Sequence, residues 1–447
     1  MTGPTAGPVY RGTTFRRAPR DRLMPVLVAA CALAGLCRAI SPATGDQTGR
    51  QPMSADLQAM TTRVLSQRGS TRATEYTLSN KIVTFGHRTH VAWLDTVSEI
   101  MVATQDHRTG EWTAPTHVGS GRDNHGGPAL TCDSRGYLHI IFGPHGGAFQ
   151  HCRSAAPNDA TQWVRLPDFG ENATYPSVVC DDADTLHIVY RGGPVPPKLI
   201  YQRRPAGGEW SRPRVIAHVP GTGPAYTHFG ATLVVGPQWS LHMGYHFYYQ
   251  GTTYSDGYLV SRDRGDTWCL AKGATPALPI APDAEAFFTH CPKGSNDLSG
   301  LAVDGEGLPW VTLWRPDVVL ELWHYDGERW VSCLPYRLTS PPIDFADLVP
   351  GHYPIATDPQ GRIYVALTVG GQATVLRSSD RGKTFERLRL APAAPDGPHQ
   401  GFNFERPTGH NVVGVPWLLF RTGSSGEDCE GEGLLNRVTA VQFGPAE

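Results

Sequence analysis

Residues that can carry a proton or contact a sugar recur along the chain, each at the start of a similar short segment. These opening residues are His125, Tyr175, His228, Asn296, His352 and His410. A buried apolar core would not require polar side chains at equivalent positions. Histidine and tyrosine transfer protons, and aromatic rings pack against sugar faces. We therefore predict that these residues line a polar funnel that binds a carbohydrate.

A second set of side chains adds rings and positive charge to the same funnel. It lies where the second stretch of each segment ends, and its members are His145, Tyr190, Arg191, Tyr245, Tyr248 and Arg315. Arginine pairs well with a carboxylate or sulfate, so the set is suited to an anionic sugar. Any one of these residues could instead be a structural hydrogen-bonding group. We expect His139, His187 and His242, at matching positions within the segments, to pack the repeat.

The segments that carry these residues form an internal repeat. In one copy, residues 125–130 are typical of a short strand, residues 133–136 of a tight Asp/Gly turn, and residues 137–143 of a second strand. The pattern returns about every 50 to 70 residues, and a copy at residues 81–94 brings the number of units to seven. Each unit continues with a third and usually a fourth strand, as in a propeller blade. The sequence predicts an all-β fold, a seven-bladed β-propeller.

Two units carry a further turn motif. Residues 261–268 (SRDRGDTW) and 378–385 (SSDRGKTF) fit the pattern S-x-D-x-G-x-[ST]-[WF]. The pattern resembles the Asp box of sialidase-like propellers, in which Asp and Gly shape a turn and the aromatic residue packs into the blade. Because Asp boxes are structural, they predict the fold and not a catalytic activity.

The charge and the N-terminal segment limit where the protein acts. The 447 residues carry a formal net charge of −2, which argues against a general nucleic-acid binder. Arginines before an apolar run at residues 23–36 predict a signal peptide over residues 1–43, and hence a secreted, cell-surface or periplasmic protein. Residues 28–31 loosely resemble a lipobox, so a lipid anchor is an alternative. The run is shorter than the roughly 20 residues of a membrane span.

The remaining chain is predicted to hold a linker and one domain. Residues 44–70 are polar and are expected to form a loose linker, and residues 71–447 are expected to form the propeller. We expect the last strand, residues 437–443, to close the ring by pairing with a strand near residues 71–78.

The motifs at the segment starts resemble the BNR-repeat family that contains ulvan lyases, most similarly polysaccharide lyase family 25 and next family 24. They are residues 124–130 (NHGGPAL), 143–145 (GPH), 174–176 (TYP) and 186–191 (LHIVYR). The resemblance covers roughly residues 75–440, and its most specific part is the pair His125 and His145. It implies a lyase that cleaves a 4-linked uronic acid by β-elimination in an anionic, sulfated, ulvan-like polysaccharide. This chemistry requires no cofactor.

The resemblance also implies catalytic roles. His125 and His145 correspond to the two active-site histidines, and Tyr190 corresponds to the tyrosine expected to act as base. The arginine that neutralises the substrate carboxylate falls at Arg203 or Arg204, since only one of two neighbouring strand residues can face the site; we expect Arg204. The second tyrosine falls at Tyr245 or Tyr248, and we expect Tyr248. The expected substrate-binding residues are Asn124, Tyr175, Arg191, His228, Tyr245, Asn296, Arg315, His352 and His410.

A structural zinc is a further implication of the resemblance. The expected ligands are Cys269, His290 and Cys291, although their spacing is not that of a recognised zinc site. Buried free thiols are the alternative reading. Outside the signal segment no C-x-x-C pair occurs among the seven cysteines, so no disulfide framework is predicted.

Two other functions stay open at this point. A sialidase-type glycoside hydrolase would need an arginine triad and a Tyr–Glu pair, and no glutamate is evident beside a tyrosine of the funnel. A non-catalytic carbohydrate-binding propeller is the other alternative, because a fold does not fix a function. In each case we expect a monomer whose partner is a carbohydrate, without nucleic-acid binding and without stable membrane insertion after processing.

Overall fold

Antiparallel strands supply almost all of the regular structure. The structure is a computed structural model that describes residues 61–444 except 97, 195, 219–226, 250–252, 282–285, 292–296, 316, 391–396 and 424–434. The chain divides into the units Met1–Asp56 and Leu57–Glu447, and every feature described below belongs to the second. The expected signal peptide therefore lies outside the described residues. Among the described residues, no helix has the length and apolarity needed to cross a bilayer.

Three sheets contain four antiparallel strands each, in chain order. The 3-10 helix η1 (Pro237–Trp239) lies between the first two strands of the first of these sheets. The helices η2 (Pro335–Leu338) and η3 (Phe345–Asp347) lie between the second and third sheets along the chain. The strands of the three sheets are β13 (Thr227–Val235), β14 (Leu241–Tyr249), β15 (Thr253–Ser261) and β16 (Phe287–Cys291); β17 (Asp297–Val303), β18 (Pro309–Arg315), β19 (Val319–Tyr325) and β20 (Trp330–Cys333); and β21 (Ile355–Thr357), β22 (Ile363–Val369), β23 (Gln372–Ser378) and β24 (Glu386–Arg389).

A seven-stranded sheet precedes them in the chain, with the order β12-β11-β10-β9-β8-β7-β6. Its long central strand β9 pairs with β8 along its first part and with β10 along its last part. One strand thus serves two successive repeat units. The strands are β6 (Ala129–Cys132), β7 (Leu138–Phe142), β8 (Gly147–Ala156), β9 (Asp159–Cys180), β10 (Leu186–Gly192), β11 (Lys198–Arg204) and β12 (Arg214–Ala217).

The remaining sheet joins the two ends of the described chain. Its order is β25-β26-β27-β1-β3-β4-β5, with β2 beside β3. Strand β1 pairs along its length with β27, from Thr61 opposite Gln442 to Gly69 opposite Asn436. The strands are β1 (Thr61–Gly69), β2 (Ile82–Phe85), β3 (Arg88–Asp95), β4 (Glu99–Asp106), β5 (Thr116–Ser120), β25 (His399–Phe404), β26 (Leu418–Thr422) and β27 (Asn436–Gln442).

The position of β1 corrects the expected linker. The sequence analysis assigns residues 44–70 to a linker and places the closing strand near residues 71–78, but residues 61–69 form that strand. Polar composition concealed it, because most β1 side chains are exposed and the strand is held by backbone pairing with β27.

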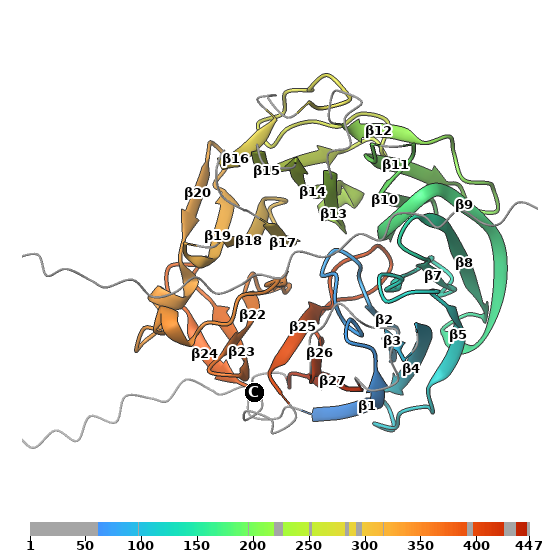
Figure 1. Ribbon diagram of the computed structural model, residues 1–447, viewed down its shortest axis with the longest axis horizontal. Helices are drawn as coiled ribbons and strands as arrows, with labels where there is room; N and C mark the ends of the chain where they lie inside the picture. The colour runs from blue at the N-terminus through green and yellow to red at the C-terminus, as the bar shows by residue number, and fades with distance from the viewer. Residues whose placement is uncertain are drawn as a thin grey trace, which may run out of the picture. The chain divides into compact units, whose positions relative to one another are not determined.

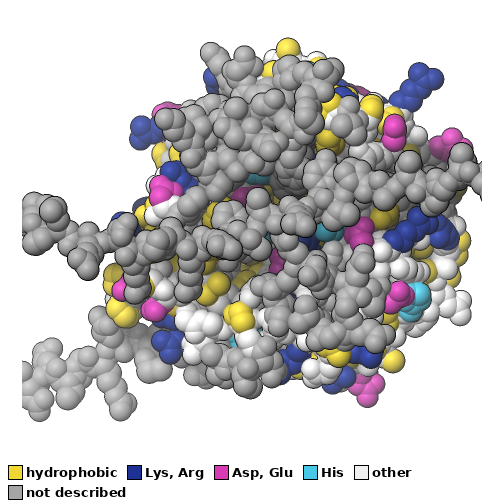
Figure 2. Space-filling model, in the orientation of Figure 1, with side chains coloured by type: hydrophobic (Ala, Val, Ile, Leu, Met, Phe, Trp, Pro, Cys, Tyr) yellow, Lys and Arg dark blue, Asp and Glu magenta, His cyan; other side chains and the backbone are white. Residues whose placement is uncertain are grey.

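The sheets of this unit follow one another around a common centre in chain order (Figure 1). Apolar side chains of adjacent sheets pack against each other, as where Trp268 and Tyr201 meet edge to face at 5.4 Å. Acidic, basic and apolar side chains are interspersed on the part of the visible face that described residues form (Figure 2). The expected packing role of His139, His187 and His242 is confirmed, since all three are buried within the strands.

The turn that follows β15 and precedes Trp268 is shaped by one carboxylate. The Asp263 carboxylate accepts hydrogen bonds from the Thr267 backbone N–H (2.8 Å) and the Ser261 hydroxyl (2.8 Å). Gly265 has φ +85°, and a Cβ there would overlap the Tyr201 hydroxyl, so glycine is required. Asp380 makes the corresponding bonds with Thr384 and Ser378.

Two irregular segments meet the inner strands at the centre. In the segment 405–412, the carbonyl oxygens of Pro407 and Thr408 accept hydrogen bonds from the backbone N–H groups of Val235 (3.0 Å) and Cys180 (2.8 Å). The Arg406 guanidinium donates to carbonyl oxygens of the second segment, residues 70–81. These bonds fix loops from both ends of the chain against the inner strands, and the second loop carries part of the site.

Candidate active site

Two histidines are held side by side by one carboxylate. The Asp123 oxygens accept the backbone N–H groups of His125 and His145, both at 2.7 Å. The two imidazole rings lie 4.5 Å apart, and His125 Nδ1 is 3.5 Å from the Asp123 carboxylate. Burial alone would raise the pKa of Asp123, but its hydrogen bonds with both histidines lower that pKa overall. Asp123 is therefore the charged group that orients the pair.

The loops that carry the histidines approach each other closely. His125 lies in the loop before β6, and His145 lies in the turn between β7 and β8. A Cβ on Gly126 would lie 2.7 Å from the Gly121 Cα and 2.9 Å from the Gly143 carbonyl oxygen. Only glycine allows this approach, so the glycines of the motif at residues 124–130 serve to place the histidines.

Two tyrosines in an unusual backbone conformation complete the group of rings. Tyr76 and Tyr175 have φ values of 62° and 57°, in the left-handed region that tyrosine rarely adopts. Their rings lie 4.9 Å apart. Tyr175 is 6.4 Å from the His125 ring and 5.9 Å from the His145 ring. Such backbone strain is often stored at functional sites.

Arginines approach the rings from two sides. Arg72 donates to the Tyr76 hydroxyl, and Arg191 Nη1 lies 3.3 Å from His145 Nε2. Desolvation, followed by the positive charges of His125 and Arg191, lowers the pKa of His145 to about 4. His145 is thus neutral near pH 7, with Nε2 as the acceptor of the Arg191 N–H. The arrangement can bind an anion and move a proton.

Tyr190 does not belong to this group. Its side chain is buried against Phe149 at 5.2 Å, and its hydroxyl donates to Gln202 at 2.6 Å. Burial raises its pKa further above the usual value of tyrosine. The expected catalytic base is therefore corrected: successive side chains of β10 point to opposite faces, so Arg191 faces the histidines and Tyr190 faces the core.

Arg203 and Arg204 are also remote from the histidines. In the β10–β11 register Arg204 lies opposite Leu186, whereas Arg191 lies opposite Leu199. Leu186 and Arg191 are five positions apart along β10, which corresponds to about 16 Å. Arg203 pairs with Asp266 at 2.7 Å. Their position corrects the expected neutralising arginine, for which Arg72 and Arg191 are better placed.

The expected site residues of the fourth and fifth units lie mostly outside the described residues. The side chains of His228 and Tyr248 and all of Asn296 lie outside the described residues. Tyr245 is described: it is fully buried in the core and donates to the Ala286 carbonyl oxygen at 3.3 Å. Tyr245 packs among the apolar side chains of the core and its hydroxyl is bound to Ala286, so its expected substrate-binding role is corrected.

Of the remaining expected substrate-binding residues, some lie near the histidine pair or the tyrosines and others lie elsewhere. Asn124 adjoins His125 and is buried, and within the described residues no partner is found for its Nδ2. His352 lies 3.9 Å from Asp297, and its charge helps to lower the pKa of Glu75, the neighbour of Tyr76. Burial opposes this lowering and Arg421 supports it.

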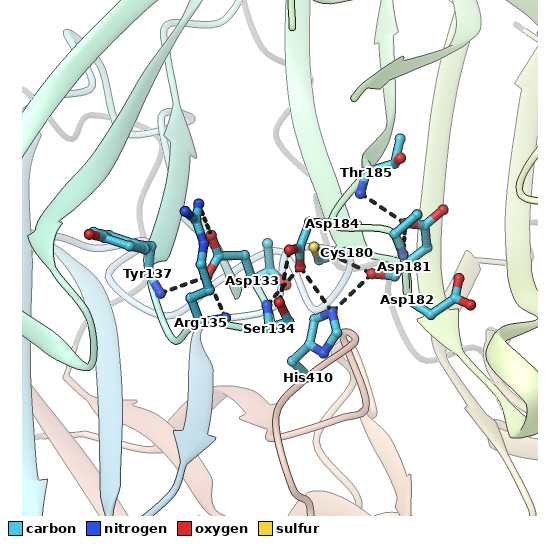
Figure 3. Close-up of polar contacts among 12 residues, drawn as sticks. Asp133, Ser134, Arg135, Tyr137, Cys180, Asp181, Asp182, Asp184, Thr185 and His410 are labelled. Atoms are coloured by element: carbon cyan, nitrogen blue, oxygen red, sulfur yellow. Dashed lines mark hydrogen bonds and ion pairs between the residues drawn. The ribbon is translucent and has the colours of Figure 1, made fainter. Parts of the chain in front are cut away.

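Arg315 and His410 are engaged elsewhere. Arg315 pairs with Asp317 (3.1 Å) and Glu321 (3.0 Å) in its own hairpin. His410 lies beside Asp181 and Asp184 (Figure 3), just past the end of β9 at Cys180. Cys180 is five positions along the strand from Tyr175, or about 16 Å. The expectation that His410 contacts the same substrate as the histidine pair is therefore corrected.

The expected zinc ligands are separated by the strand register. Cys269 lies opposite Val260, while His290 lies opposite Ser255 and Cys291 opposite Tyr254 on the same strand. Val260 and Ser255 are five positions apart along β15, which corresponds to about 16 Å. The side chains of His290 and Cys291 lie outside the described residues. This register does not bring the three residues to one metal position.

Sequence reasoning missed Asp123, Arg72 and Tyr76. Asp123 directly precedes the motif that begins at Asn124, so a search for a carboxylate beside the histidine could have found it. Arg72 and Tyr76 lie in the segment before the first repeat unit, where no repeat pattern indicates which residues face the centre. Only the folded arrangement brings them to His125.

A protein-family model described as BNR repeat-containing family member matches residues 88–331, which is more than half of the 447 residues. The chain belongs to the BNR repeat-containing family. This match includes His125, His145, Tyr175 and Arg191, but not Arg72 and Tyr76.

Curated relatives of the family match over a shorter stretch. An ulvan lyase of Alteromonas sp. (strain LOR) is 32% identical over 140 residues, which cover 26% of this chain and 29% of the relative. The Ulvan Lyase-PL25 of Pseudoalteromonas sp. (strain PLSV) is 29% identical over 140 residues, with the same coverage. The matched part thus spans less than a third of each relative.

The fold is shared over a greater length. A solved structure of a PL25 ulvan lyase bound to -[GlcA(1-4)Rha3S]- aligns with a TM-score of 0.68 at 15% identity. The alignment covers 84% of this chain and 94% of that chain. At this identity the likeness establishes the fold, and the activity has to be argued from the site.

Proposed function

We propose that this chain is a polysaccharide lyase that cleaves a 4-linked uronic acid in an ulvan-like, sulfated polysaccharide by β-elimination. The observation that carries the proposal is the pair His125 and His145, oriented by Asp123 and flanked by tyrosines and arginines. The curated relatives are ulvan lyases, which agrees with this chemistry.

Each requirement of the elimination has a group in the site. The substrate carboxylate must be neutralised before the C5 proton is acidic enough to be removed. Arg191 and Arg72 supply positive charge next to the histidine and tyrosine rings. A positioned side chain then removes the C5 proton, and another protonates the departing O4.

We assign the base to His125 and the acid to Tyr175. Asp123 lies beside His125 Nδ1, so an N–H on that nitrogen would leave Nε2 free of a proton and able to accept one. His145 is a weaker base, since Arg191 approaches its Nε2. Tyr175 contacts both histidine rings and carries a hydroxyl that can donate to O4.

The finer features of the fold and its setting belong to the same proposal. We propose that the strands form seven blades, with Asp boxes at Asp263 and Asp380, closed by the pairing of β1 with β27. The secreted location, the cleaved signal peptide and the monomeric state are proposed on the sequence alone. An extracellular enzyme would meet such a polymer directly.

The test is digestion of ulvan followed by ultraviolet absorbance, since elimination leaves a double bond conjugated to the uronate carboxylate. The wild-type chain should raise the absorbance, and His125→Ala should lower the rate by at least about 100-fold. No absorbance rise across a panel of uronate polymers would contradict lyase activity. Full activity of His125→Ala would contradict the assigned base.

A further inference from the structure

Three potential metal-binding side chains converge where β9 ends at Cys180 (Figure 3). They are Cys180, Asp184 and His410, whose sulfur, carboxylate oxygen and ring nitrogen all lie within 4.8 Å of one another. None of them takes part in the proposed elimination.

The fold brings His410 to this place from a distant part of the chain. The Cys180 backbone N–H donates to the Thr408 carbonyl oxygen at 2.8 Å. The intervening Gly409 has φ +134°, and a Cβ there would overlap the Cys180 carbonyl oxygen. The Trp239 ring packs 4.8 Å from the His410 ring. Close backbone contact and ring packing thus both fix His410 against the end of β9.

The distances suit a small tetrahedral cation. His410 Nε2 lies 3.3 Å from Asp184 Oδ1. Ligand bonds of about 2.0 to 2.2 Å place two tetrahedral ligand atoms about 3.3 Å apart. Asp184 is held in place because its two oxygens accept the Ser134 backbone N–H (2.7 Å) and hydroxyl (2.8 Å). A movement of the Cys180 side chain by about 1 Å would bring the sulfur into the same shell.

The local charge also favours a cation. The carboxylates of Asp181, Asp182 and Asp184 gather here, and Arg264 pairs with Asp182 at 2.9 Å. Cys180 is fully buried beside these carboxylates (Figure 3). A divalent cation would replace the thiol proton and offset the negative charge.

We propose that Cys180, Asp184 and His410 bind one zinc-like divalent cation, which ties the end of β9 to the segment 405–412. A mixed sulfur, nitrogen and oxygen set of this kind suits Zn²⁺ rather than Ca²⁺ or Mg²⁺. Because this segment also bonds to β6 and β13, the ion would lock the centre of the domain.

The competing reading is a metal-free hydrogen bond. His410 Nε2 lies 2.9 Å from the Asp181 carbonyl oxygen, to which a protonated Nε2 would donate. In that case His410 would be purely structural, and metal would have no effect on the fold. Metal content and the spectrum of a bound ion distinguish the two readings.

The experiment uses the full chain, dialysed after exposure to Zn²⁺ or to Co²⁺ as a spectroscopic probe. We expect wild type to retain about one Zn²⁺ more per chain than Cys180→Ala or His410→Gln. With Co²⁺ it should show a thiolate-to-metal band that both variants lack, and a chelator should lower the Tm of wild type only. Cys152→Ala is the matched control, since Cys152 is also a buried thiol but lies in β8.

Two results would overturn the proposal. One is a wild-type chain that retains no metal and whose Tm is unchanged by Zn²⁺. The other is equal metal retention by wild type and Cys180→Ala, which would place the ion elsewhere. If Cys180→Ala fails to fold, Asp184→Asn decides, because it keeps the shape of the side chain and removes the charged ligand.

Discussion

The proposed chemistry depends on single side chains whose roles are set by their partners. Asp123 binds the backbone of both histidines, and its carboxylate lies beside the ring of only one of them, His125. His145 is instead approached by Arg191. Two identical residue types therefore have different proton chemistry within one site.

Removing the charge of Asp123 should slow the reaction. Without the carboxylate, His125 loses the group that favours a proton on Nδ1, so we expect Asp123→Asn to lower kcat about 10- to 100-fold. KM should change little, because the arginines that bind the substrate remain. Initial rates on ulvan measure both constants. Asp133→Asn is the control, since Asp133 also accepts two backbone N–H groups but lies in a distant turn; equal losses in both variants would refute a specific role.

The two tyrosines provide a direct comparison. Tyr175→Phe removes the proposed proton donor and should lower kcat at least about 100-fold. Tyr190→Phe removes a buried hydrogen bond to Gln202, so it should cost about 1 kcal/mol of unfolding free energy and leave kcat nearly unchanged. Initial rates on ulvan give kcat, and urea unfolding gives the free energy of unfolding, for each of the two variants. A large loss of kcat in Tyr190→Phe alone would reverse the assignment.

At the scale of elements, strand alternation explains what the sequence could and could not predict. The repeat pattern predicted the strands, and the motif at residues 124–130 predicted the histidine pair that the structure brings together. The sequence placed both Tyr190 and Arg191 of β10 in the site, and only packing shows that Arg191 lies beside His145 while Tyr190 faces the core. Arg72, Tyr76 and β1 lie outside the repeat, so their long-range contacts left no local signal.

The closing strand should be needed for stability although it looks like a linker. A chain that begins at Ser70 loses the pairing of β1 with β27 and exposes the edge of β27. We expect a Tm several degrees lower than that of a chain that begins at Leu57, measured by circular dichroism. Equal Tm values would show that β1 adds nothing to the fold.

At the scale of the whole molecule, buried titratable groups should set its response to acid. Burial lowers the pKa of His90 to about 4, and that of His139 and His242 to about 3. Burial raises the pKa of Glu405 to about 7. Below pH 6.5 the unfolded chain binds protons at these three histidines and the folded chain does not. The free energy of unfolding therefore decreases as the pH decreases. Between pH 7 and 4.5 the folded chain binds a proton at Glu405 that the unfolded chain does not, so Glu405 increases the free energy of unfolding as the pH decreases.

The balance predicts a net loss of stability in mild acid. The histidines with lowered pKa values, which also include His145 and His151, outnumber Glu405, so the free energy of unfolding should be several kcal/mol lower at pH 5 than at pH 7. Urea unfolding at the two pH values measures the difference. Glu405→Gln removes the opposing group and should make the loss larger; an unchanged or smaller loss would contradict the assigned protonation states.

The most direct test of the central claim is the mass of ulvan fragments produced in water enriched in ¹⁸O. Elimination breaks the glycosidic bond without adding water. We therefore expect fragments with an unsaturated uronate at each new non-reducing end and no ¹⁸O introduced by bond cleavage. Saturated new non-reducing ends, on fragments heavier by one water than the unsaturated ones, would show hydrolysis and would contradict a lyase built on His125, His145 and Tyr175.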